Sequence, residues 1–162
     1  MAQPTGYSRI QIVLHWTILF LIIANYLTGE AMIAAFDGFY EDGVDAMSWQ
    51  AGLHVWFGTA ILAAVALRLG LRWRRGVPPL APQTHDVMAV AAHLTHAALY
   101  GLLMAVPALG MLAWFAGWTE MGDVHVVAMN VLMTLITLHA GAALFHHYVL
   151  RDGLLMRMMR PS

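Results

Sequence analysis

The chain has 162 residues, of which 60% are hydrophobic and only 10% charged, and its formal net charge is −1. A soluble domain carries roughly 25% charged residues, so this composition excludes an ordinary soluble protein and predicts an integral membrane protein. The length suits about four spans of about 20 residues, and we expect no soluble catalytic domain beside them. Because cysteine is absent, disulfides, thiolate metal sites, iron–sulfur clusters and covalent haem attachment are excluded. Ligation of a cofactor therefore falls mainly to the nine histidines.

Four apolar runs predict four membrane-spanning helices within a single domain that covers residues 1–162. The first run is longer than the apolar core of a signal peptide, so we expect it to remain as a helix. Residues 76–82 are rich in proline and predict a surface linker, and Pro107 with Gly110 predicts a kink in the third helix. The predicted helices cover about residues 10–29, 51–71, 87–115 and 124–150. The fold class is therefore all-α, an integral membrane four-helix bundle.

The charged residues divide between the two ends of this bundle. Every basic residue is an arginine, and all eight precede the first helix or end or follow the second and fourth: Arg9, Arg68, Arg72, Arg74, Arg75, Arg151, Arg157 and Arg160. The other two connections carry seven acids, namely Glu30, Asp37, Glu41, Asp42, Asp45, Glu120 and Asp123. By the positive-inside rule, both termini are expected in the cytoplasm and the acidic loops on the opposite side.

Four of the histidines in the predicted spans, His15, His54, His125 and His139, can be paired by depth. His125 and His139 are fourteen residues apart, which on a helix is about 1400° of rotation and roughly 21 Å of rise, so they share one face at two depths. The arginine pattern places His15 in the inner half with His139, and His54 in the outer half with His125. Polar residues inside a span mark function by default, so two depth-matched pairs suggest two cofactors.

The type of ligand limits which cofactor these histidines can bind. Two imidazoles per site, with no thiolate or carboxylate at matching depth, suit a low-spin haem iron whose two axial positions are both filled. Such an iron has no open position, so it transfers electrons and does not bind a substrate. The alternatives are histidines satisfied by interhelical hydrogen bonds, or a zinc site, which needs three or four converging ligands. We therefore expect two haem b groups, the inner one held by His15 and His139 and the outer one by His54 and His125.

The pattern of these residues resembles the bacterial cytochrome b561 family over nearly the whole chain. The residues that carry the resemblance are Tyr7-Ser8-Arg9-Ile10-Gln11, His15-Trp16, His54-Val55 with Gly58, His125 fourteen before His139, and Leu138-His139-Ala140 with His146-His147-Tyr148. The family consists of small four-helix di-haem cytochromes of the inner membrane, and a related fold serves as the cytochrome b subunit of nickel–iron hydrogenases. The resemblance implies axial ligands on the first, second and fourth helices, with two on the fourth. Some stand-alone members oxidise superoxide at the outer face and reduce ubiquinone.

The leading functional hypothesis is therefore an oxidoreductase that moves electrons from superoxide to ubiquinone. One alternative is an electron-transfer subunit that links a separate dehydrogenase or hydrogenase to quinone. Another is a haem-free, histidine-rich metal-binding protein or transporter. Seven acids on the outer loops should repel the superoxide anion, although salt screens this over about 8 Å. They would equally suit a basic soluble electron donor, or serve topology alone. Lipid surrounds the chain, and no nucleic-acid partner is expected.

The remaining histidines and arginines gather at the inner end. We predict that His146 and His96 bind ubiquinone, because quinone reduction consumes protons and histidine titrates in the appropriate range. Interfacial histidines can instead simply tolerate the headgroup region, and no role is assigned to His85. A metal site is a further alternative and would use His93, His96, His146 and His147. Arg9 and Arg68 are predicted to bind the propionates of the inner haem, since arginine pairs with carboxylates bidentately.

Overall fold

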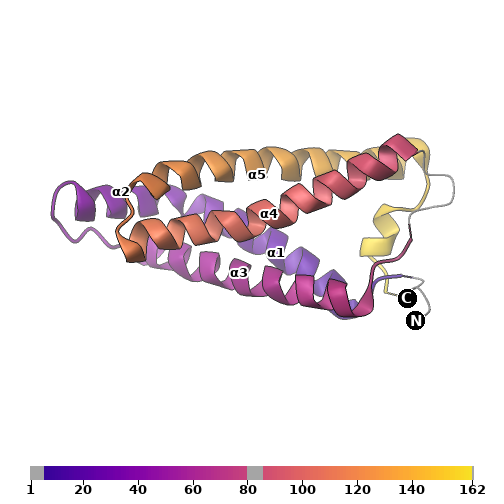
Figure 1. The fold of residues 1–162 in the computed structure, drawn as a ribbon, viewed down its shortest axis with the longest axis horizontal. Helices are drawn as coiled ribbons and strands as arrows, with labels where there is room; N and C mark the ends of the chain where they lie inside the picture. The colour runs from indigo at the N-terminus through magenta and orange to yellow at the C-terminus, as the bar shows by residue number, and fades with distance from the viewer. Residues whose placement is uncertain (1–5, 80–85, 162) are drawn as a thin grey trace.

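A computed structural model describes residues 6–79 and 86–161, and Figure 1 shows its arrangement. Helix makes up 83% of the described residues, and no strand occurs among them. The α-helices are α1 (Arg9–Leu27), α2 (Gly29–Tyr40), α3 (Trp49–Arg75), α4 (Asp86–Ala116) and α5 (Glu120–Phe145). A π-helical turn, η1 (His146–Leu150), and a 3₁₀ turn, η2 (Leu155–Met158), follow α5.

Four of these helices are long and apolar enough to cross a membrane, which confirms the four predicted spans. They are α1, α3, α4 and α5 continued by η1. The third span continues as a helix through Pro107. Residues 80–85, which include His85 and part of the predicted linker, lie outside the described residues.

The loop expected after the first span is wrong in one respect, because it contains a further helix, α2. The first span ends at Leu27, and the Thr28 hydroxyl donates to the carbonyl oxygen of Asn25 at 2.8 Å where the chain turns. Residues 29–40 are mostly alanine, methionine, glutamate and aromatic residues, which allow a helix, but their acids and two glycines hid it from the apolar pattern. The second span is also longer than expected and runs from Trp49 to Arg75.

Local sequence explains where α3 begins and ends. Its N-cap is Ser48, whose hydroxyl oxygen accepts a hydrogen bond from the backbone N–H of Ala51 at 3.2 Å. Three arginines occupy its last turn, where positive charge complements the exposed carbonyl groups of the helix end. Gly76 then adopts φ 72°, a left-handed conformation that ends helices at low steric cost in glycine.

The bundle consists of two closely packed helix pairs. Ile18 and Ile22 of α1 form one core with Ile61 and Val65 of α3. The second core lies between α4 and α5 and contains Leu99, Val106 and Leu132. Contacts between α3 and α4 join the two pairs, whereas α5 reaches the α1–α3 core mainly through the side chains of Met129, Met133 and Ile136. The backbone of α5 therefore lies farther from the α1–α3 pair than the backbones within each pair lie from each other.

The two ends of the bundle differ in charge and in chain connections. The first and last described residues lie at one end with the end of α3 and the start of α4, while α2 and the turn from α4 to α5 lie at the other (Figure 1). The tail is fastened at the first of these ends: the Trp16 indole donates to the carbonyl oxygen of Met158 at 2.9 Å, and Arg157 donates to that of Pro79 at 2.7 Å. An even number of spans places both termini at the same end, and all arginines lie at that end too. We call this the arginine end, and the opposite one the acidic end.

Candidate functional site

Both predicted histidine pairs face each other in the structure. The ring centroids of His54 on α3 and His125 on α5 are 6.1 Å apart, with ring planes at 73°. Those of His15 on α1 and His139 on α5 are 6.4 Å apart, with ring planes at 74°. Each pair thus spans the space between α5 and the α1–α3 pair, the first nearer the acidic end and the second nearer the arginine end.

The separation within each pair fits one metal ion between two imidazoles. A bond from a first-row metal to an imidazole nitrogen is about 2.0 Å and the ring centroid lies roughly 1.2 Å behind that nitrogen, so opposed rings have centroids about 6.4 Å apart. The observed 6.1 and 6.4 Å agree with this value. Between the rings of either pair no hydrogen bond is found, so the imidazoles do not satisfy each other.

Main-chain oxygens orient the rings of the pair nearer the acidic end. The Nδ1–H of His54 donates to the carbonyl oxygen of Asn25 at 3.1 Å, and that of His125 donates to the carbonyl oxygen of Val106 at 2.8 Å. Since a carbonyl oxygen can only accept, the proton sits on Nδ1 and leaves Nε2 as the free electron-pair donor. Histidine ligands of metals are commonly held in this way. Sequence reasoning missed both oxygens, because every residue carries one.

Two further residues shape the same region. A Cβ atom on Gly110 would lie 3.1 Å from Nδ1 of His125, so only glycine lets this ring come so close to α4. Asn25 is buried, and its Oδ1 has no hydrogen-bond partner within residues 6–79 and 86–161. A buried acceptor without a partner costs free energy, which fits a group that fills the neighbouring space.

That space is a cavity of about 1250 Å³. Asn25, His54, Gly58, Gly110 and His125 all line it, and its volume exceeds the roughly 300–1,000 Å³ of typical small-molecule pockets. It therefore has room for a large planar group between the two imidazoles. Five of the seven acids of the acidic end also line it: Glu30, Asp37, Glu41, Glu120 and Asp123.

A third histidine stands beside the pair nearer the arginine end. The ring centroid of His96 is 5.2 Å from that of His139, which is too short for a metal ion between opposed rings. Its Nδ1–H donates within its own helix, to the carbonyl oxygen of Ala92 at 2.6 Å. His96 therefore flanks this pair and does not compete with His15 for the facing position.

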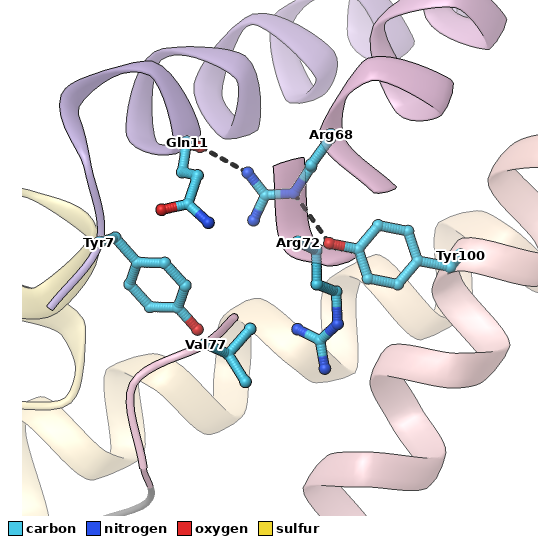
Figure 2. Close-up of a pocket in the computed structure, with 6 residues that line it drawn as sticks. All are labelled: Tyr7, Gln11, Arg68, Arg72, Val77 and Tyr100. Atoms are coloured by element: carbon cyan, nitrogen blue, oxygen red, sulfur yellow. Dashed lines mark hydrogen bonds between the residues drawn. The ribbon is translucent and has the colours of Figure 1, made fainter. Parts of the chain in front are cut away.

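Arg68 belongs to a polar cluster next to this pair, shown in Figure 2. Its guanidinium donates to the backbone oxygen of Gln11, one helical turn before His15, and to the Tyr100 hydroxyl at 3.1 Å. Arg72 lies over the Tyr100 ring, 5.7 Å from its centroid. The cluster surrounds a cavity of about 10 Å³, room for about one water molecule. Arg9, by contrast, lies exposed at the start of α1.

The histidines at the arginine end do not form one site. His146 pairs with Asp152, and His93 is exposed and donates to the carbonyl oxygen of Ala89 at 2.7 Å. In the described part of the chain, no three histidine or acidic side chains converge on a point. The metal site considered for His93, His96, His146 and His147 is therefore not assembled.

A membrane bundle with histidines paired across it at two depths defines the class of b-type membrane cytochromes. The chain belongs to the prokaryotic cytochrome b561 family, whose model matches residues 6–161. It is accordingly a multi-pass protein of the bacterial inner membrane that binds haem b and transfers electrons. Membership removes the haem-free metal-binding protein or transporter as an alternative.

Three relatives extend over almost the whole chain. Cytochrome b562 of Cereibacter sphaeroides is 43% identical over 161 residues, covering 99% of this chain and 99% of its own length. Probable superoxide oxidase CybB of Yersinia pestis is 30% identical over 174 residues, covering 94% of this chain and 95% of its own length. Cytochrome b561 homolog 1 of Escherichia coli is 29% identical, with 94% and 96% covered.

Proposed function

We propose that the chain, as a single domain, holds two haem b groups and carries electrons across the membrane to ubiquinone. The proposal rests on one observation: the bundle holds two pairs of facing histidines, one nearer each end. In each pair, the rings have the separation that one metal ion requires. His54 and His125 would hold the outer haem, and His15 and His139 the inner one. Bound haem b supplies one-electron redox chemistry at each position.

The residues around the histidines have supporting roles in this proposal. The carbonyl oxygens of Asn25 and Val106 keep the outer imidazoles turned with Nε2 toward the cavity. Arg68 is held by Gln11 and Tyr100 near the inner pair, where its remaining N–H groups can meet a propionate. Arg9, exposed at the start of α1, is a second candidate for a propionate.

We infer that superoxide is the electron donor and that ubiquinone is reduced at the arginine end. Two superoxide anions each lose one electron and become dioxygen, and one ubiquinone takes up two electrons and two protons to become ubiquinol. The name of the Yersinia pestis relative supports this reaction. His96, beside the inner pair, and His146, at the end of α5, are the proposed quinone contacts.

A second candidate donor is a basic soluble redox protein, in which case the chain acts as an electron-transfer subunit. The specific support is the ring of acids on the cavity that contains His54 and His125. Negative charge there slows the approach of an anion and speeds that of a cation.

The first experiment measures haem content and both half-reactions. A pyridine haemochrome assay on the purified protein should give two haem b per chain. Stopped-flow mixing with superoxide should then reduce the haem faster than dismutation removes the superoxide, and ubiquinone should reoxidise it. Haem-free protein would overturn the whole proposal, whereas reoxidation by ubiquinone without reduction by superoxide would favour the subunit.

Salt dependence separates the two donors. Raising ionic strength from about 10 mM to 0.15 M shortens the range of charge effects from about 30 Å to about 8 Å. Reduction by superoxide should become faster, and reduction by a basic protein slower. At low salt, the double variant Glu120→Gln, Asp123→Asn should likewise make reduction by superoxide faster and reduction by a basic protein slower. Rates indifferent to both changes would remove the acids from the reaction.

A further inference from the structure

The chain changes direction sharply just after α5. The π-helical turn η1 begins at His146, and such turns are frequent at functional sites. Arg151 follows with φ 53° and ψ 34°, a left-handed conformation that is sterically unfavourable for a residue with a side chain. Among the described residues other than glycine, no other has a positive φ. The result of this turn is that Asp152 folds back onto His146.

The contact between them is the one ion pair in the part of the chain that the structure describes. Nδ1 of His146 meets Oδ2 of Asp152, and the backbone N–H of Leu154 donates to Oδ1 at 2.9 Å. Desolvation acts to raise the pKa of the Asp152 carboxyl, but the hydrogen bonds from His146 and Leu154 outweigh it and lower that pKa. Asp152 is thus a carboxylate that accepts from His146 Nδ1–H, and the free ring atom of His146 is Nε2.

The position of His146 relates it to the inner pair. As the first residue after α5, it follows His139 by seven residues, about 700° of rotation and roughly 10 Å along a helix axis, so the two lie on nearly the same face. The pair also lies where the last span ends, because that span runs to Leu150, and the His146 and Asp152 side chains are 20% and 24% exposed. A proton can therefore reach Nε2 from the aqueous phase at the arginine end.

We propose that His146 and Asp152 form a proton-donating pair for ubiquinone reduction, with Asp152 as a positioning residue; this rests on the proposed function. Nε2–H of His146 gives its proton to a carbonyl oxygen of ubiquinone while the electrons arrive from the superoxide side. Water at the arginine end then reprotonates Nε2, and the second proton follows the same route. Asp152 accepts from Nδ1–H and so fixes the orientation of the ring that presents Nε2 to the quinone.

Three variants of the haem-loaded, full-length chain test this assignment. Asp152→Asn keeps the shape and a hydrogen-bond acceptor but removes the charge. Asp152→Glu restores the charge on a longer arm. Asp86→Asn, at the start of α4, removes an exposed carboxylate at the same end that makes no side-chain hydrogen bond or ion pair among the described residues, and is the matched control.

The readout is steady-state reduction of a short-chain ubiquinone together with stopped-flow reoxidation of prereduced haem. We expect Asp152→Asn to lower kcat about tenfold or more with KM changed less than twofold, in line with the 10- to 100-fold effects of removing a carboxylate behind a functional histidine. Asp152→Glu should recover at least a third of the wild-type kcat, and Asp86→Asn should match wild type.

Other results would overturn the assignment. An unchanged kcat in Asp152→Asn, a loss expressed only in KM, or a loss that Asp152→Glu does not rescue would each exclude a positioning role. Reduced haem content in Asp152→Asn would make the pair a purely structural contact and also overturn it. Failure of the wild-type protein to pass electrons to ubiquinone is a separate result, which would overturn the proposed function itself.

Discussion

At the scale of single residues, each proposed haem depends on two histidines from different helices. Replacing one of them leaves a five-coordinate or empty site, so one group should be lost and the other kept. We predict that His54→Ala or His125→Ala lowers the content from two haems per chain to one, and that His15→Ala or His139→Ala does the same. The low-spin spectrum of the variants that keep only the inner haem should differ from that of the variants that keep only the outer haem. Two low-spin haems in His125→Ala would show that the pairing is wrong.

Gly110 gives a sharper test of the outer site because it alters no proposed ligand. An added Cβ would lie 3.1 Å from Nδ1 and 3.2 Å from Cε1 of His125, so the ring must shift by a few tenths of an ångström, which disturbs the geometry of its hydrogen bond to Val106. We predict that Gly110→Ala releases the outer haem about tenfold faster to apomyoglobin, the lower end of losses seen on disturbing the partner of a metal-bound histidine.

The control for this variant is Gly101→Ala on the same helix. No atom lies within 4 Å of a Cβ built there, and both changes raise helix propensity alike. Haem release from Gly101→Ala should equal that of wild type. Equal release from both variants would mean that close approach of His125 to α4 does not matter for binding.

Residue patterns in the sequence foresaw the facing histidines but not what holds them. Helical spacing and the distribution of arginines were enough to pair His15 with His139 and His54 with His125, because both depend only on regular geometry and on charge. The carbonyl oxygens of Asn25 and Val106 belong to the backbone and leave no mark in the sequence. Asp152 was missed because its contact with His146 depends on the left-handed conformation of Arg151. Such a conformation is usually predicted from a glycine, and position 151 is an arginine.

At the scale of elements, α2 is the part of the fold that hydropathy did not predict. It lines the cavity at the acidic end through residues such as Met32 and Phe36, and it is fastened to α4 by the Tyr40 hydroxyl, which donates to the carbonyl oxygen of Trp114 at 2.7 Å. Aromatic contacts of Phe36, Phe39 and Tyr40 with Trp114 surround this bond. The helix forms because tertiary contacts complete it, which a pattern of residues along one segment does not contain.

We therefore predict that Tyr40→Phe loosens α2 without unfolding the spans. Loss of one hydrogen bond costs about 1 kcal/mol, which corresponds to roughly fivefold faster local opening. Hydrogen exchange measured by mass spectrometry should rise about fivefold over residues 29–40 and stay unchanged in α3 and α5. Tyr148→Phe, which removes an exposed hydroxyl at the other end, should leave exchange in α2 at the wild-type rate. Unchanged exchange in Tyr40→Phe would mean that the aromatic contacts alone hold α2.

At the scale of the whole molecule, the four spans were predictable, but their packing was not. Runs of apolar residues fix the number and approximate length of the helices. They do not say that α1 packs closely on α3 and α4 on α5, while α5 reaches the α1–α3 core mainly through side chains. Lipid-facing and helix-facing residues are both apolar in a membrane, so the partner of each face is decided by shape, which the amphipathic pattern does not record.

The orientation of the bundle in the membrane is a prediction from charge alone. All arginines lie at one end and seven acids at the other, and the positive-inside rule then puts the arginine end in the cytoplasm. The chain contains no cysteine, so single cysteines can report each side. We chose Val44 and Met159, which are 59% and 55% exposed and lie at the acidic and arginine ends. In cells with a permeabilised outer membrane, a membrane-impermeant maleimide should label Val44→Cys at once and Met159→Cys only after the inner membrane is lysed. Labelling in the reverse order would place the acidic cavity on the cytoplasmic side, where periplasmic superoxide could not reach it.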